Sequence, residues 1–149
     1  MIRQFRLEDA EACCELVRAC IRYDLELPQA QRLALLQMES SQSMHERGKL
    51  YYLAVYESER TVVGLGGLDM NEIRMLFVSP ACQRRGIGKA ILEHLEAMVP
   101  PALFREVFVY AALSAASFYR ARGYSEHGEH FFDWCGQRLT TIFMTKKLR

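Results

Sequence analysis

The chain has 149 residues, of which 50% are hydrophobic and 25% are charged, and its formal net charge is +1. This length fits one domain over residues 1–149 with a sizeable core. A nearly neutral chain has no overall attraction to nucleic acid or to an anionic membrane, and no apolar run approaches the ~20 residues that span a bilayer. We therefore expect neither nucleic acid nor a membrane as a partner.

The five cysteines are odd in number and show no C-x-x-C spacing. They predict reduced thiols in a cytoplasmic setting, without a disulfide framework. His127, His130 and Cys135 lie close in sequence but fit no usual zinc spacing, so we expect no metal. The first residues lead directly into a charged stretch, which is not typical of a signal peptide.

The N-terminal half is expected to hold two helices and four strands. Acidic residues open the first helix, where Asp9 could cap it, and Pro28 suits the first turn of a second helix that ends before Gly48. Glycines in the third strand weaken it unless a backbone or ligand approaches closely. The predicted strands are Ile2 to Arg6, Leu50 to Tyr56, Val62 to Leu68 and Glu72 to Val78.

The C-terminal half continues the alternation of helices and strands. A helix from Arg85 to Met98 precedes a fifth strand, Val107 to Ala111, and a fourth helix, Ser114 to Arg122, which Gly123 closes. Two more strands follow, near Tyr124 to Trp134 and Arg138 to Lys147. Strands with interspersed helices indicate a mixed sheet in a layered α/β or α+β fold.

The segment from Gln83 to Lys89 carries the strongest chemical signal, because it joins a strand end to a helix start. The first amides of a helix have no intrahelical partners and lie at the positive end of its dipole, so they can bind an anion. Gly86 and Gly88 remove Cβ atoms there, and the flanking arginines and lysine add positive charge. The pattern matches neither a P-loop nor a dinucleotide fingerprint, since Gln83 and Ile91 occupy required glycine positions.

The turn lies within a longer pattern: a hydrophobic strand with V-x-P, then Q-x-x-G-x-G, written here Ile73-Arg74-Met75-Leu76-Phe77-Val78-Ser79-Pro80 and Gln83-Arg84-Arg85-Gly86-Ile87-Gly88. A second pattern, A-x-x-F-Y-x-x-x-G-Y, runs from Ala115 to Tyr124. Together they closely resemble motif A and the A-x-x-F-Y motif of the GNAT acetyltransferases. The resemblance covers nearly the whole chain, and it implies a mixed, mostly antiparallel seven-stranded sheet flanked by about four helices, with a splay between strands 4 and 5.

The resemblance also implies an acetyl-coenzyme A site. Amides from Arg84, Arg85, Gly86, Ile87, Gly88 and Lys89 would hold the pyrophosphate, and Gln83 would orient the turn. The strand Leu76, Phe77 and Val78 would pair with the pantetheine arm, and the N–H of Leu76 could polarise the thioester carbonyl. Family members often have Asn where this chain has Ala112, and Ser114 could partly replace it.

Two further side chains have implied catalytic roles. Tyr119 matches the tyrosine that often protonates the departing thiolate, although packing beside Phe118 is the alternative. Glu72 lies as many residues before Gly86 as the catalytic glutamate does in the histone-acetylating branch of the family, which implies a role as the base. Two alternatives stay open: Glu72 is only a solvated carboxylate at a strand end, or the proton leaves through ordered water. Tyr52, Glu129 and His130 are weaker candidates for the base.

The implied function is direct transfer of an acetyl group from acetyl-coenzyme A to a primary amine. Two alternatives stay open: a non-catalytic coenzyme A-binding regulatory module, and a phosphate or nucleotide binder. The acceptor would be a small molecule or a peptide. Its site would be shaped by the segment from Asp9 to Arg47 and by the final hairpin. Protein N-terminus, lysine, antibiotic and polyamine acceptors all stay open, as does a homodimer.

Overall fold

The computed structural model describes residues 1–149, which build a mixed sheet of seven strands in the order β1-β2-β3-β4-β5-β7-β6. Every neighbouring pair is antiparallel except β4 and β5, which run parallel. This confirms the predicted fold class. The strands are β1 (Ile2–Gln4), β2 (Tyr52–Ser58), β3 (Thr61–Asp69), β4 (Glu72–Val78), β5 (Glu106–Ala112), β6 (Ser125–Trp134) and β7 (Gln137–Lys147).

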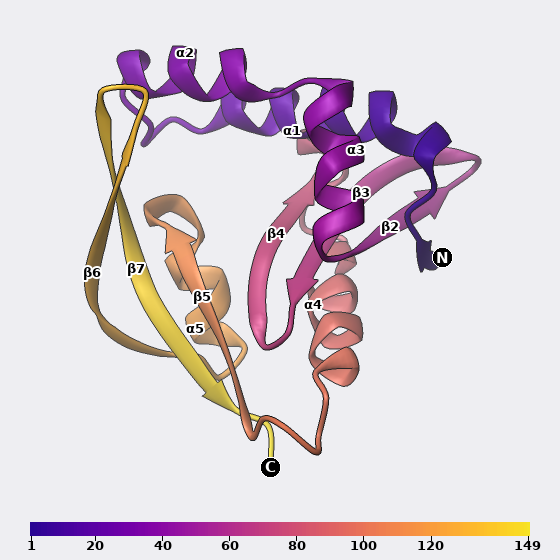
Figure 1. Ribbon diagram of the computed structural model, residues 1–149, viewed down its shortest axis with the longest axis vertical. Helices are drawn as coiled ribbons and strands as arrows, with labels where there is room; N and C mark the ends of the chain where they lie inside the picture. The colour runs from indigo at the N-terminus through magenta and orange to yellow at the C-terminus, as the bar shows by residue number, and fades with distance from the viewer.

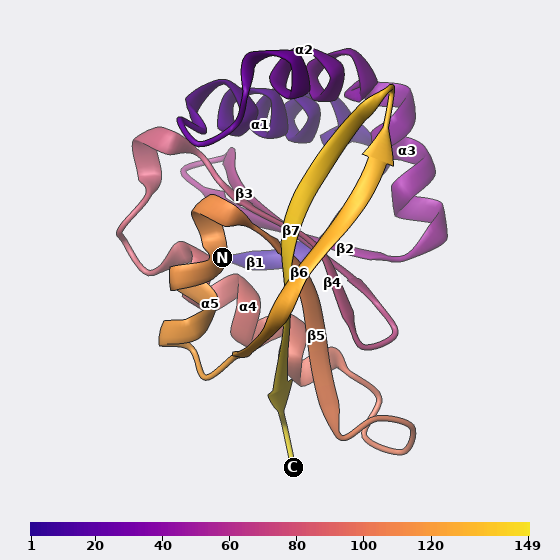
Figure 2. The ribbon, with the colours of Figure 1, turned by 90° about the vertical axis from the view of Figure 1, so that its left-hand side faces the viewer.

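Helices cover both faces of the sheet (Figures 1 and 2). Helices α1 and α3 share a buried cluster with β2, β3 and β4 on one face, while α4 and α5 share a larger one with β3, β4, β5 and β7 on the other. No helix is long and apolar enough to cross a bilayer. The five α-helices are α1 (Ala10–Tyr23), α2 (Gln29–Met38), α3 (Ser41–Leu50), α4 (Ile87–Met98) and α5 (Ala116–Ala121).

The start of the first helix differs from the prediction. Asp9 does not cap α1 with its side chain, because it lies at the end of a short 3-10 turn (Leu7–Asp9). Its carboxylate accepts a hydrogen bond of 2.7 Å from the Arg6 N–H and two of 2.9 Å from the Arg3 guanidinium. The Arg3 hydrogen bonds hold the pKa of this buried carboxyl below its usual value. Asp9 therefore ties β1 to the helix.

The predicted second helix is in fact two helices, α2 and α3, which gives five helices instead of about four. Ser40 starts the new helix: its hydroxyl accepts from the Ser43 N–H at 3.1 Å, and the Ser43 hydroxyl accepts from the Ser40 N–H at 3.0 Å. Such reciprocal capping satisfies amides that a helix start leaves free. Gly48 consequently lies inside α3, where a Cβ would come within 2.9 Å of the Phe5 ring.

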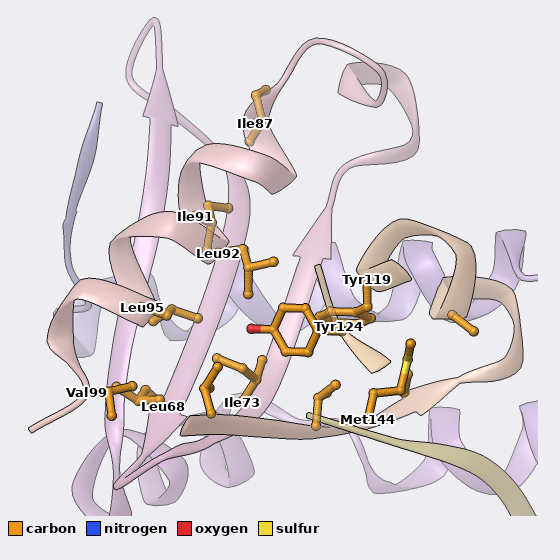
Figure 3. Close-up of a cluster of buried hydrophobic side chains, with 14 of the residues drawn as sticks. Leu68, Ile73, Ile87, Ile91, Leu92, Leu95, Val99, Tyr119, Tyr124 and Met144 are labelled. Carbon is orange, nitrogen blue, oxygen red and sulfur yellow. The ribbon is translucent and has the colours of Figure 1, made fainter. Parts of the chain in front are cut away.

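Two glycines of β3, Gly64 and Gly66, are explained by the close approach of helix α4. A Cβ on Gly66 would lie 2.5 Å from Ile91 Cγ2, and one on Gly64 would lie 2.6 Å from Ile91 Cδ1. Figure 3 shows Ile91 and Leu95 projecting from α4 toward the sheet. The glycines therefore weaken the strand locally but allow α4 to pack tightly on it.

The sheet forks between its two parallel strands. β4 and β5 pair only through Glu72 with Phe108 and Ile73 with Val109, and beyond these pairs they diverge (Figure 1). The divergence confirms the predicted splay. It leaves the C-terminal half of β4 with a neighbour, β3, on one side only.

We expect Gly66→Ala to lower the free energy of unfolding by about 1–3 kcal/mol, because its methyl group would overpack against Ile91. Chemical denaturation measures the loss. The double variant Gly66→Ala/Ile91→Ala should lose less than the sum of the two single variants, since each change makes room for the other. Additive losses would show that the contact between β3 and α4 does not require glycine.

Candidate functional site

The turn between β4 and α4 is held by its own side chains and dihedral angles. After Val78 comes a 3-10 turn, Pro80–Cys82, and the Gln83 side-chain amide then donates to the Val78 carbonyl at 3.2 Å. Arg84 and Gly86 have positive φ values of 64° and 80°. Alternating left-handed residues turn successive amides toward one concave side, which is a geometry that binds anions.

The two glycines of the turn have different roles. A Cβ on Gly86 would meet no atom within 4 Å, so this position is open to a ligand, and its positive φ favours glycine. A Cβ on Gly88 would lie 3.3 Å from the Phe118 ring. Gly88 therefore lets α4 pack against α5, whereas Gly86 shapes the open turn.

A cavity of about 630 Å³ lies between the start of α4 and helix α5. It brings together most of the residues that the sequence predicted for the cofactor. These are Leu76, Val78, Gln83, Arg84, Gly86, Ile87, Gly88, Lys89, Ser114 and Tyr119. Positive side chains and free helix amides at one end, with apolar strand residues at the other, suit a ligand that joins phosphates to an apolar arm.

One extra residue in β4 determines which amides face the fork. β4 pairs Ile73 with Leu68 and Met75 with Gly67, so Arg74 is a bulge with no partner on β3. Before the bulge, the Asn71 carbonyl accepts a hydrogen bond from the Phe108 N–H of β5. Beyond the bulge, the Ser79 N–H donates to the Val63 carbonyl of β3. Bulges change which backbone groups face a neighbouring strand.

Alternation along β4 then places the backbone groups of Leu76 and Val78 on the side away from β3. The Val78 carbonyl supports this, since it accepts from the Cys20 thiol and the Gln83 amide, each at 3.2 Å. The Leu76 N–H consequently faces the fork and has no strand partner there.

Tyr119 lies on α5 between two other aromatic rings and lines the cavity. Its ring centroid is 5.3 Å from that of Phe118 and 5.2 Å from that of Tyr124, and only 4% of the residue is exposed. Figure 3 shows Tyr119 within the cluster that includes Leu92 and Met144. Burial raises the pKa of Tyr119 well above its usual value, so the phenol keeps its proton at neutral pH.

Arg122 also lines this cavity, although the sequence analysis did not select it. Its guanidinium lies 4.5 Å from the centroid of the Phe118 ring, and its buried Nε has no hydrogen-bond partner. Arg122 occupies a variable position of the A-x-x-F-Y pattern, so the motif contains no signal for it. The guanidinium of Arg122 adds a positive charge to the lining of the cavity, which suits an anionic ligand.

The structure places several other predicted residues elsewhere. Phe77 packs with the α1 cluster on the opposite face, and Arg85 does not line the cavity. The Ser114 hydroxyl lines it but donates to Asp24 at 3.0 Å. No three His, Cys, Asp or Glu side chains gather as a metal site would require.

The base candidates are spread over the sheet. Glu72 lies at the base of the fork, with 21% of its side chain exposed, and forms an ion pair of 3.3 Å with Arg74. Tyr52 hydrogen-bonds His94 at 2.8 Å on the α4 side, while Glu129 and His130 lie on β6. Among these four, only Glu72 belongs to a strand that forms the fork.

Comparison with known proteins identifies the class. The family model described as "Acetyltransferase (GNAT) domain" matches residues 24–147, so the chain belongs to the GNAT acetyltransferase family. It is therefore an acyltransferase, and acetyl transfer is its general chemistry. No curated protein matches the chain.

Solved structures of low sequence identity share this fold. A GCN5-related N-acetyltransferase from Rhodopseudomonas palustris, described as "Aminotransferase, Class-II", has a TM-score of 0.93 at 23% identity and covers 99% of this chain and 95% of its own. The PaiA N-acetyltransferase from Thermoplasma acidophilum, in complex with coenzyme A, has a TM-score of 0.78 at 19% identity, covering 99% and 98%. A phosphinothricin acetyltransferase from Sinorhizobium meliloti, in complex with AcCoA, has a TM-score of 0.68 at 23% identity, covering 99% and 88%.

The open position at Gly86 predicts a charge effect on acetyl-coenzyme A binding. Asn and Asp both tolerate a positive φ, so Gly86→Asn and Gly86→Asp differ mainly in charge. We expect the aspartate variant to bind more weakly than the asparagine variant by about 1–4 kcal/mol, or about fivefold to a thousandfold in Kd, because its carboxylate would repel phosphate. Calorimetry measures both constants, and equal affinities would mean that no phosphate lies beside Gly86.

Proposed function

We propose that this protein is an acetyl-coenzyme A-dependent N-acetyltransferase that moves the acetyl group directly to a primary amine. The observation that carries the proposal is the fork, where the unpaired Leu76 N–H, the Gly86 turn and the Tyr119 phenol belong to one cavity. Direct transfer requires the amine and the thioester to meet in one place, and a gap between two strands supplies it.

The proposed donor site uses the backbone more than side chains. Amides from Arg84 to Lys89 would hold the pyrophosphate at the positive end of α4, and Arg122 would add a charged donor. Leu76 and Val78 offer the strand edge for the pantetheine arm, while the amide of Phe77 faces β3. Gln83 supports the turn by its hydrogen bond to the Val78 carbonyl.

In the proposed step, the amine nitrogen forms a bond to the carbonyl carbon and the C–S bond breaks. Negative charge on the thioester oxygen is stabilised by the Leu76 N–H, as in an oxyanion hole. Tyr119 gives its proton to the departing sulfur, and the proton that the amine loses restores the phenol in the overall balance. Burial raises the pKa of Tyr119, so the phenol carries its proton when the thiolate departs.

Tyr119→Phe should lower kcat by about 10²-fold or more while leaving the Kd for acetyl-coenzyme A nearly unchanged, since it removes a proton donor without changing the packing. Release of free thiol measures turnover, and calorimetry measures binding. Tyr56→Phe on β2, outside the cavity, is the matched control. Unchanged turnover would return Tyr119 to a packing role.

We propose Glu72 as the base that accepts the proton of the amine, directly or through water. Glu72 pairs with Phe108 in one of the two residue pairs that join β4 to β5. Its neighbour Ile73 packs toward α4, so alternation directs Glu72 to the opposite face of the sheet. An acceptor that entered from this face would meet a carboxylate. Charge attraction would also favour a cationic amine there.

Glu72→Gln should lower kcat/KM about 10²-fold near neutral pH, because the amide cannot accept the proton. The deficit should shrink as the pH rises, since more of the amine is then already deprotonated. Asp69→Asn is the control, because Asp69 contacts the same Arg74 at 4.0 Å. A similar loss in both variants would mean that Glu72 acts only by orienting Arg74.

A coenzyme A-binding module without turnover is the second candidate. Ala112, in the place of a frequent Asn, and the engagement of Ser114 by Asp24 favour it, since two polar contacts to the cofactor are thereby absent or occupied. Thiol release from acetyl-coenzyme A with a panel of amines separates the two candidates.

We also propose that residues 1–149 act as one cytoplasmic domain, which five free cysteines support.

A further inference from the structure

Six aromatic side chains form a continuous cluster on β5, β7 and β6, which we call the aromatic face. Tyr110 lies at its centre, with ring centroids at 4.8 Å from His130, 5.2 Å from Phe132 and 5.2 Å from Phe143. The cluster is completed by Phe108 beside Tyr110 and Phe143, and by His127 beside Phe143. His127, His130 and Phe132 are exposed, and the other three are half-buried.

The aromatic face lies on the side of the sheet opposite the cofactor cavity. Val107, Val109 and Met144 are buried with α4 and α5. Alternation therefore directs Phe108 and Tyr110 the other way, and Phe143 shares their face because it pairs with Tyr110. The α4 and α5 side is the side on which the proposed donor site lies.

The aromatic face begins where the fork opens. Val109 is the last residue of β5 that pairs with β4, so Tyr110 is the first residue beyond the fork. Phe108 pairs with Glu72 at the last rungs, and both side chains point to the aromatic side. An amine that approached from this side would pass the rings on one flank and a carboxylate at the base.

We propose that the acceptor is a primary amine joined by a short chain to an aromatic ring, and that the aromatic face selects it. The inference rests on the proposed function, because it assumes that the donor occupies the other side of the fork. Rings bind rings in offset or edge-to-face contacts, and Tyr110, His130 and Phe132 already adopt such tilted geometries. The ammonium group would lie toward Glu72.

The charges of this region disfavour a polyamine. A chain with several cations needs several carboxylates, but none of the six side chains of the aromatic face is a carboxylate. One ammonium group and one ring fit the groups that are present.

The test measures thiol release by the full chain at saturating acetyl-coenzyme A with 2-phenylethylamine, 2-cyclohexylethylamine, spermidine and a short peptide with a free N-terminus. The two ethylamines differ mainly in aromaticity. We expect kcat/KM to be about 2- to 10-fold higher for the phenyl amine than for its cyclohexyl analogue, chiefly through KM, and higher than for the other two acceptors.

Two phenylalanines of β6 supply a matched pair of variants. Phe132 belongs to the aromatic face and is 38% exposed, whereas Phe131 points to the other face, near Arg138, and is 48% exposed. Phe132→Ala should remove the preference for the phenyl amine, and Phe131→Ala should keep it. Because both side chains are exposed, neither change should prevent folding.

Equal kcat/KM for the two ethylamines, or a preference for spermidine or the peptide, would overturn this inference and leave acetyl transfer to amines intact. Equal effects of Phe131→Ala and Phe132→Ala would overturn it as well. Absence of thiol release with every amine would instead overturn the proposed function on which the inference rests.

Discussion

The structure depends on the point where β4 and β5 stop pairing. Two rungs hold these parallel strands together, and the bulge at Arg74 lies directly beyond them. Because of the bulge, the amides of Leu76 and Val78 face the gap that opens instead of the neighbouring strand. Backbone amides that a neighbouring strand leaves unpaired bond to water or to a ligand, so the fork offers a strand edge to an extended ligand.

The two faces of the fork have different chemistry. On the α4 and α5 side are the open turn at Gly86, the positive charge of Arg122 and the buried phenol of Tyr119, which together suit an anionic thioester. On the α1 side, Glu72 lies next to the aromatic rings of β5 and β7. A donor and an acceptor that approach from opposite faces would meet at the Leu76 amide without competing for space.

Much of this arrangement could be predicted from local sequence. The strands were predicted within a few residues of their observed bounds, Gly123 marked the end of the Tyr119 helix, and two motifs located the turn and that helix. The glycines of β3 were correctly expected to need a close neighbour, which is Ile91 of α4 for Gly64 and Gly66 and the side chains of Tyr51 and Leu53 for Gly67. These features depend on residues a few positions apart, and short-range patterns encode them well.

The rest depends on contacts between distant segments. Asp9 has a usual capping residue type, but its carboxylate bonds Arg3 of β1 instead of the start of α1. The break at Ser40 was missed in the sequence analysis, although the polar run from Glu39 to Ser43 contains a usual helix-capping residue. The ring cluster around Tyr110 exists only because β5, β7 and β6 align in one register, which no local pattern determines.

Residue-resolved amide hydrogen exchange, with and without acetyl-coenzyme A, tests the central claim most directly. If the fork binds the thioester arm, the amides of Leu76 and Val78 should become protected together with those of the turn from Arg84 to Lys89. The amides of Met75 and Phe77, which already face β3, should change little. Protection of the turn alone, with Leu76 and Val78 unchanged, would contradict the account, because the fork would then be a structural gap beside a phosphate site.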